Sequence, residues 1–397
     1  MAKSDSHIAE IQGSYGPITV SEMLIQKIWM RRDFETDGLK TRDGAALRIL
    51  DPGVWNLQEG PDFKDARLEI GGRRVEGDVE VHFYARDWRN HGHSKDGAFN
   101  RVVLHIVLFE PSAREPPAAT SNGKQPATLV LLPWLRKDIE EYAEDDAILS
   151  LEQRDQFELI APLLRAPASR RRILLMEKSA IRLRQKVAAA QSRIARFGWR
   201  ESCHISCLEI LGYRRNRAPM AALALRYPLG KMATRACAPA EYVLEPGINW
   251  KRSGLRPANR PEVRLGQYCR VLNINPDWPS DLRAVEFPVG GGSPSVAASD
   301  FRKRADLPSL RRRVADGVLA GEIGGTRLDT LVCDGFIPLL AALQGFDLSD
   351  CWNYWYRGDS PDSLLQMLRL LAVADGRRWV LCNGYLQDGF QWLLDTA

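Results

Sequence analysis

The stretch Asp78-Val-Glu-Val-His82 alternates ionisable and apolar residues with a period of two. Successive side chains of a β-strand point to opposite faces, so Asp78, Glu80 and His82 would form a row on one face. A face that only contacts solvent would favour lysine, threonine and mixed charges. Two carboxylates and an imidazole in one row instead favour a site that binds a metal or moves a proton.

A neighbouring strand would bring another carboxylate to this row. The Gly71-Gly72 pair is typical of a hairpin turn, and Asp62 lies before it. Metal-dependent cleavage of a phosphodiester needs oxygen ligands for a divalent cation and a group that orients water. We therefore expect Asp62 and Glu80 to bind the metal, with Asp78 as an auxiliary acid. His82 would orient water or act as general base, because an imidazole titrates near neutral pH.

The elements around this row follow the order helix, strand, hairpin, connection and central strand. Residues 87–100 are polar and contain glycine, which predicts a connection that is mostly loop. Ser21 is a plausible N-cap of the helix, whose first turn would contribute Glu22 as a further acid. The predicted elements are a helix over Val20–Phe34 and strands over Ala45–Leu50, Lys64–Ile70, Arg74–Tyr84, Arg101–Glu110 and Ala127–Leu132.

Three further histidines lie in the same part of the sequence. His91 and His93 fall in the polar connection, where the alternative interpretation is polar surface, and His105 lies inside the apolar run Val102–Leu108. Burying an unpaired imidazole is costly, so His105 is either hydrogen-bonded in the core or directed at the same site as His82. Imidazole ligands would shift the preferred metal from Mg²⁺ towards Mn²⁺ or Zn²⁺. The expected cofactor is a divalent metal, Mg²⁺ or Mn²⁺, with Zn²⁺ as the alternative.

Gly60-Pro61-Asp62 followed by Glu80-x-His82 resembles the PD-(D/E)xK, or restriction-endonuclease-like, nuclease superfamily. The resemblance covers about a quarter of the chain and implies a core of helix, three strands, helix and strand. By position, Asp62 corresponds to the Asp of the motif, Glu80 to its second acid, and His82 to the place normally held by lysine. Glu22 would be the optional acid on the helix.

A second resemblance covers almost the whole chain. The blocks that carry it are GPDF, GDVEVH, DWRNHGH and NRVVLHIV, followed by LGYRRNRAPMAALALRYPL and LRPANRPEVRL. This series is similar to a bacterial family of unknown function. It implies family membership without implying an activity.

The remainder of the chain has helical periodicity. In Arg170–Arg196, apolar residues recur every three or four positions, which predicts an amphipathic helix. The opposite face is rich in arginine and lysine and contains the single acid Glu177, so we expect either a solvated face or a surface that binds nucleic acid. The residues expected to contact nucleic acid are Arg171, Arg172, Arg182, Lys186, Arg193, Arg214 and Arg215.

The composition fits a cytoplasmic globular protein. The chain has 397 residues, 45% of them hydrophobic, a formal net charge of +5, and seven cysteines without a disulfide framework. We expect no signal peptide and no membrane-spanning segment. Glycine-rich phosphate loops of the P-loop or Rossmann type are not found in the sequence. The oligomeric state and protein partners stay open.

These observations predict an α+β protein with two domains. A restriction-endonuclease-like domain with a mixed sheet would occupy residues 1–132, and a mostly α-helical domain would occupy residues 133–397. The expected activity is metal-dependent hydrolysis of nucleic acid. One alternative is a catalytically inactive protein of the same fold that binds nucleic acid or assists assembly, and another is a histidine-rich metal enzyme on a cupin-like β-barrel.

Overall fold

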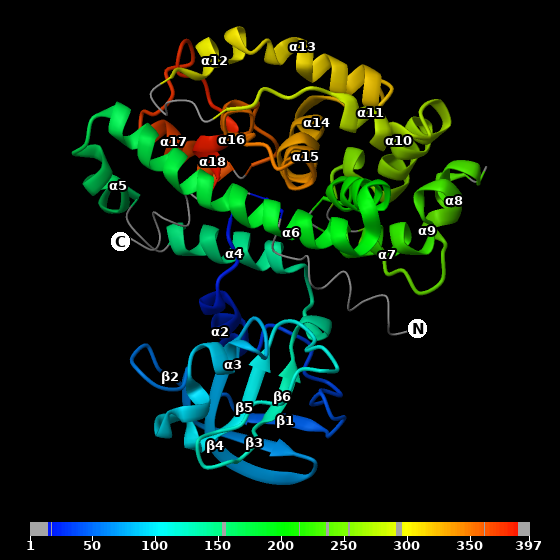
Figure 1. Cartoon of the computed structure of the whole chain (residues 1–397). Coiled ribbons are helices and arrows are strands. Elements are labelled where there is room, and N and C mark those ends of the chain that lie inside the picture. Colours follow the sequence, from blue (N-terminus) through cyan, green and yellow to red (C-terminus); the bar gives the residue numbers. More distant parts are fainter. Residues whose placement is uncertain are drawn as a thin grey trace. The chain divides into compact units, whose positions relative to one another are not determined.

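The structure is a computed structural model that describes residues 15–16, 18–152, 156–213, 215–235, 238–252, 255–290, 296–360 and 362–387. These residues form two compact units (Figure 1). The first, here called the sheet unit, extends from Val20 to Tyr142. The second, the helical unit, combines Ala143–Ala397 with the preceding segment Ile11–Thr19. The fold is therefore of mixed α/β type, with the sheet in the N-terminal part and a helical C-terminal region.

The sheet unit contains one long helix, a mixed sheet and several short helical turns. In chain order these are α2 (Glu22–Arg31), β1 (Leu47–Asp51), β2 (Val54–Trp55), β3 (Phe63–Ile70), β4 (Arg73–His82), α3 (Asp87–Asn90), η1 (His93–Lys95), η2 (Gly97–Arg101), β5 (Val102–Val107), β6 (Ala127–Val130) and η3 (Leu132–Trp134). The predicted strands are thus confirmed, with shifts of a few residues at their ends.

The strands follow chain order across a curled sheet, β1-β3-β4-β5-β6, with β2 paired to β3 (Figure 1). The pairs β1/β3 and β3/β4 are antiparallel, whereas β4/β5 and β5/β6 are parallel. Gly71 and Gly72 join β3 to β4 and both have positive φ, as a two-residue hairpin turn requires. The parallel pairs do not match a cupin barrel, whose strands are antiparallel.

Helix α2 begins where the sequence predicts it. The Ser21 hydroxyl accepts a hydrogen bond from the Leu24 N–H at 3.3 Å, which caps the first turn. Ile25 and Ile28 are buried, so one face of the helix belongs to the core of the unit. This anchoring fixes the orientation of the first turn, which contains Glu22.

The connection between β4 and β5 differs from the predicted loop. It consists of α3 and the two 3-10 turns η1 and η2, each held by local hydrogen bonds. Trp88 and Phe99 pack with Val102 and Ala118 in a small apolar cluster. Aromatic anchors, which the polar composition of this stretch obscures, therefore fold the connection over the sheet.

The buried half of β4 requires glycine at position 77. A Cβ atom there would lie 2.4 Å from the Arg101 carbonyl oxygen and 2.5 Å from a methyl group of Val103. We expect Gly77→Ala to lower the free energy of unfolding by about 3 kcal/mol, because neither backbone nor packed side chain can withdraw freely. Denaturant unfolding measures this loss. Gly97→Ala is the control, since its Cβ would meet only Asn100 at 3.7 Å.

The helical unit is built from α4 (Ile139–Glu152), which begins in the sheet unit, and the elements after it. They are α5 (Gln156–Leu164), α6 (Ala168–Leu211), α7 (Arg217–Arg226), α8 (Leu229–Thr234), α9 (Pro239–Val243), η4 (Pro257–Asn259), α10 (Pro261–Ile274), α11 (Trp278–Ala284), α12 (Ala298–Arg304), α13 (Leu307–Arg312), η5 (Arg313–Val318), α14 (Gly325–Leu331), η6 (Val332–Phe336), α15 (Ile337–Gln344), α16 (Ser349–Tyr354), α17 (Asp362–Leu370) and α18 (Asn383–Leu386).

Helix α6 is the axis of this unit (Figure 1). Its backbone leaves helical geometry at Gly198, where φ is 74° and ψ is 172°, so two helices meet there. Helices α7, α15, α16 and α18 pack along it. Among the described residues, every helix is too short or too polar to cross a lipid bilayer.

Candidate functional site

The structure brings Asp62 and Glu80 together across β3 and β4. The Asp62 N–H donates to Glu80 Oε2 at 3.1 Å, and the Val81 N–H donates to Asp62 Oδ2 at 2.9 Å. Each carboxylate thus accepts a hydrogen bond from the backbone of the opposite strand. This reciprocal pairing holds two acids side by side at the end of the hairpin.

Three histidine side chains converge beside Glu80. Glu80 Oε1 lies 3.1 Å from His93 Nε2 and 3.4 Å from His82 Nε2. His82 Nε2 is in turn 3.1 Å from His91 Nδ1. One ring nitrogen from each of the three histidines lies within 4.8 Å of the other two. The strand supplies Glu80 and His82, and the connection after it supplies His91 and His93.

This donor set fits a transition metal. His93 Nε2 is buried and makes no hydrogen bond among the described residues, because its contact with Glu80 lacks suitable geometry. An orphaned imidazole nitrogen is costly unless a cation or proton occupies the space that it faces. Bonds of about 2.0–2.1 Å in a tetrahedral zinc site place donor atoms roughly 3.3 Å apart. The contacts of 3.1 and 3.4 Å at Glu80 are close to that spacing.

His105 lies behind His82 and contacts its other ring nitrogen. His82 Nδ1 and His105 Nε2 are 2.9 Å apart, and His105 is fully buried. A metal on His82 Nε2 would leave the proton on Nδ1, which would then donate to His105. Metal-bound histidines commonly donate their second N–H in this way, which fixes the ring. Both interpretations offered for His105 therefore apply, since it is a hydrogen-bonded core residue that supports the cluster.

Burial dominates the electrostatics of the cluster. It raises the pKa values of Asp62 and Glu80, and the negative charges of Glu80 and Glu22 raise that of Asp62 further. Burial also lowers the pKa of His82, with a further contribution from His105, and it lowers the pKa of His105 to about 3. Neutral imidazoles are the form that binds metals. A divalent cation would also relieve the repulsion among the carboxylates.

Glu22 and Asp78 have different surroundings. Glu22 Oε1 accepts the Phe83 N–H at 3.1 Å, and burial raises the pKa of Glu22, so this acid belongs to the cluster as predicted from position. Asp78 instead accepts the Asp65 N–H at 3.1 Å, and the β4/β5 register shifts between Asp78 and Val79. Asp78 thus has its own backbone partner, and its role as an auxiliary acid of the site stays a prediction.

Gln26 is a site residue that the sequence motifs did not indicate. Its side-chain amide donates to Asp62 Oδ1 at 2.7 Å and accepts from Trp55 Nε1 at 3.0 Å. The available signal is spacing, since Gln26 lies four residues after Glu22 on the same face of α2. Gln26 thereby orients Asp62 from the helix.

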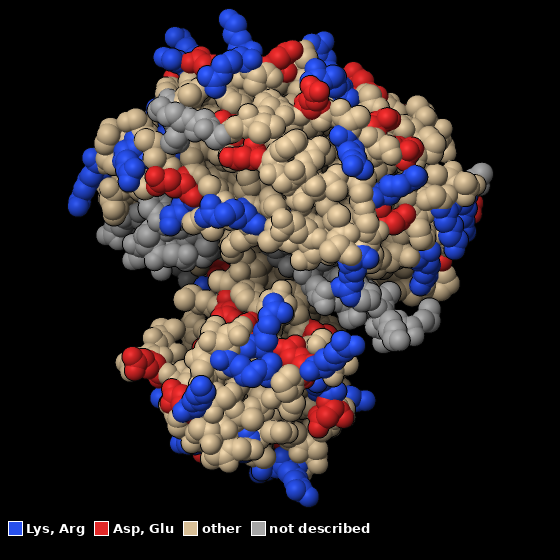
Figure 2. All heavy atoms as spheres, viewed as in Figure 1, with Lys and Arg blue, Asp and Glu red and all other residues tan. Residues whose placement is uncertain are grey.

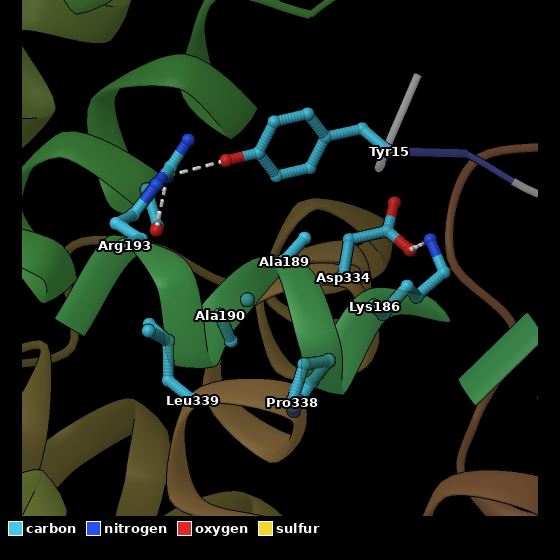
Figure 3. A pocket seen from close by; sticks show the side chains of 10 residues that line it. Tyr15, Lys186, Ala189, Ala190, Arg193, Asp334, Pro338 and Leu339 are labelled. Atoms are coloured by element: carbon cyan, nitrogen blue, oxygen red, sulfur yellow. Dashed lines mark hydrogen bonds and ion pairs between the residues drawn. The ribbon is translucent and has the colours of Figure 1, made fainter. Parts of the chain in front are cut away.

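Several basic side chains of α6 are buried, which corrects the expectation that they lie on an outer surface; they are Arg172, Arg182, Lys186 and Arg193. Lys186 pairs with Asp334 at 2.9 Å (Figure 3), and Arg193 pairs with Glu209 at 2.6 Å. Arg182 donates to the Tyr15 carbonyl oxygen at 3.1 Å. These charged groups bind other segments of the same unit. The periodicity of one helix does not show which later segments cover its polar face.

The remaining residues that were predicted to contact nucleic acid differ in their burial. Arg172 is buried and donates to the Val373 carbonyl oxygen, whereas Arg171 and Arg215 are half-buried. Arg214 lies outside the described residues. On the face visible in Figure 2, basic and acidic side chains are interspersed over the helical unit. The buried members of the set are not placed to contact a polyanion directly.

Residues 22–242, more than half of the chain, match the family described as "Protein of unknown function (DUF2851)". The chain belongs to the DUF2851 family. The DUF2851 match contains the whole cluster from Glu22 to His105 and the first part of the helical unit. No curated protein and no solved structure matches the chain. The expected membership in an uncharacterised family is confirmed, whereas the likeness to nucleases stays a prediction.

Proposed function

We propose that this protein is a metal-dependent hydrolase that cleaves phosphodiester bonds in nucleic acid. The observation that carries the proposal is the convergence of Glu80 Oε1 with ring nitrogens of His82, His91 and His93. Three imidazoles and a carboxylate are a donor set suited to Zn²⁺ or Mn²⁺ more than to Mg²⁺. His91 is exposed, which leaves one side of the cluster accessible to a substrate.

Different side chains of the protein would bind such a metal and accept a proton beside it. A bound divalent cation polarises a phosphoryl oxygen and lowers the pKa of a coordinated water. Glu22 is suited to accept the proton, because burial raises its pKa and its Oε2 has no hydrogen-bond partner among the described residues. His82 is better suited to hold the metal than to act as base, since both ring nitrogens already face other groups.

The choice of a phosphodiester as the proposed substrate is based on the positions of the acidic residues. Asp62 stands just before β3 and Glu80 lies in β4, the two positions that the PD-(D/E)xK resemblance implies. The order α2, β1, β3, β4, α3 and β5 also follows the expected helix, three strands, helix and strand, apart from the added strand β2. Histidine in place of the usual lysine favours a metal that accepts nitrogen ligands.

The test is hydrolysis by the full-length protein stripped of metal and then loaded with Mg²⁺, Mn²⁺ or Zn²⁺. Substrates are single- and double-stranded DNA, RNA and bis(4-nitrophenyl) phosphate. We expect turnover with Mn²⁺ or Zn²⁺ and a loss of at least about 100-fold for Glu80→Gln. Glu76→Gln is the matched control, because Glu76 lies on the same strand but is exposed.

Failure of every substrate would reject the hydrolase proposal, provided that the metal binds. The second candidate, a non-catalytic protein that binds nucleic acid or assists assembly, is favoured by one observation, the histidine at the lysine position. Fluorescence anisotropy with labelled DNA and RNA then tests whether the protein binds nucleic acid. Binding without cleavage by both wild type and Glu80→Gln would support that alternative.

A further inference from the structure

Two buried arginines in the helical unit lie side by side with little negative charge around them. Arg264, in α10, is 9% exposed, and Arg327, in α14, is 5% exposed. Both guanidinium groups donate to the same neutral oxygen, Asn259 Oδ1, at 2.7 and 3.4 Å respectively. A shared acceptor brings the two cations close together, although like charges repel each other in a low-dielectric environment.

Counter-charge is scarce around this pair. Arg264 donates its other hydrogen bond to Gln267 Oε1, and no carboxylate lies within 4 Å of its guanidinium among the described residues. Arg327 pairs with Asp359 at 3.1 Å, and Asp359 is 28% exposed. The Nε–H of both arginines is buried without a hydrogen-bond partner among the described residues. Burying a charge in this way is expensive unless something else compensates it.

Further groups add positive potential at the same place. Burial lowers the pKa of Arg327 to about 10; Asp359 opposes this shift, whereas Arg264 and Arg217 add to it. The Tyr213 ring lies under the Arg327 guanidinium, 4.6 Å from it. Asn259 and Asp359, which contact the pair, are only half-buried, so the pair lies close to the surface of the unit. Two forked donors with spare N–H groups suit a tetrahedral oxyanion, which accepts paired hydrogen bonds.

We propose that Arg264 and Arg327 form a binding site for a phosphate group, free or carried on a small molecule. A phosphate dianion would accept the spare N–H groups and offset the repulsion between the two cations. Asp359 would compete with phosphate for Arg327, so this carboxylate would lower the affinity of the site for phosphate. This site is independent of the metal cluster and of the hydrolase proposal.

The experiment is calorimetric titration of the full-length protein with inorganic phosphate, phenyl phosphate and acetate, alongside thermal unfolding in each. We expect saturable binding of the phosphates and a raised Tm. Arg264→Gln should weaken binding by at least about tenfold, the usual worth of a charged hydrogen bond. Asp359→Asn should tighten it, because the competing carboxylate is gone. Arg256→Gln, an exposed arginine just before η4, is the control and should leave binding unchanged.

Three results would overturn the proposal. These are the absence of saturable phosphate binding, equal affinity for acetate, or unchanged affinity in Arg264→Gln. A structural role predicts instead that Arg264→Gln lowers the Tm in phosphate-free buffer, whereas removal of an uncompensated charge should leave it unchanged or raise it. If that variant does not fold, Arg264→Lys keeps the charge, loses the forked donor and should still bind phosphate more weakly.

Discussion

Replacing His91 with alanine is expected to lower the affinity for Zn²⁺ or Mn²⁺ by at least about 100-fold. His91 Nδ1 is 3.1 Å from His82 Nε2, so the substitution removes one of the converging nitrogens. The side chain is exposed, and its removal should leave the metal-free Tm nearly unchanged. Calorimetric titration of metal into the chelator-treated protein measures the loss.

Two companion variants sharpen this result. Lys95→Ala, on the exposed surface of η1, should bind metal like wild type and controls for changes in the connection. His105→Leu should cost roughly tenfold, because His105 would orient the ligand His82 without touching the metal. Equal metal binding by wild type and His91→Ala would show that the histidine cluster is not a metal site.

Replacing Asp334 with alanine should destabilise the protein by about 3–5 kcal/mol. Asp334 accepts hydrogen bonds from Lys186 Nζ at 2.9 Å and from the Gly16 N–H at 3.0 Å, and the ion pair is almost wholly buried (Figure 3). Its loss leaves the ammonium group of Lys186 in the protein interior without its carboxylate. Denaturant unfolding at neutral pH measures the difference.

The matched control replaces both partners, as Lys186→Met with Asp334→Leu. Removing both charges should recover much of the lost stability, because an apolar pair does not have to be desolvated. Burial lowers the pKa of Lys186 to about 8 from its ordinary 10.5, so the folded state binds fewer protons than the unfolded state between these values. Wild-type stability should therefore rise with pH across that window. A double variant as unstable as Asp334→Ala would show that the ion pair is not the cause.

Short-range patterns were sufficient to predict the sheet. Alternation in residues 74–84, the apolar run before Glu110 and the Gly71-Gly72 turn each depend on neighbours in the chain, and each element is present. The hairpin brings Asp62 near Glu80, but the turn alone does not set the final register, because the β3/β4 pairing shifts by one residue between Ala66 and Phe63. The irregularity at Asp78 was not predictable from alternation, since it arises from pairing with β5.

Long-range contacts explain what the sequence could not predict. His91 and His93 reach the strand because Trp88 and Phe99 anchor the connection, and a polar loop composition conceals that packing. The basic face of α6 looked solvent-exposed because its acidic partners, Glu209 and Asp334, are distant or separated by the break at Gly198. Periodicity identifies a polar face without showing whether water or another segment covers it.

The N-terminal segment has a consequence for the order of events during synthesis. The Gly16 N–H donates to Asp334, a residue 318 positions later, and Arg182 and Lys186 donate to the carbonyl oxygens of Tyr15 and Gly16 respectively. The described part of the sheet unit, Val20–Tyr142, is continuous in sequence and can form while translation continues. In the helical unit, Gly16 cannot make its hydrogen bond until Asp334 has been synthesised and has left the ribosome. The helical unit is therefore completed late in synthesis. Until then, Lys186 in the growing chain lacks its carboxylate partner Asp334.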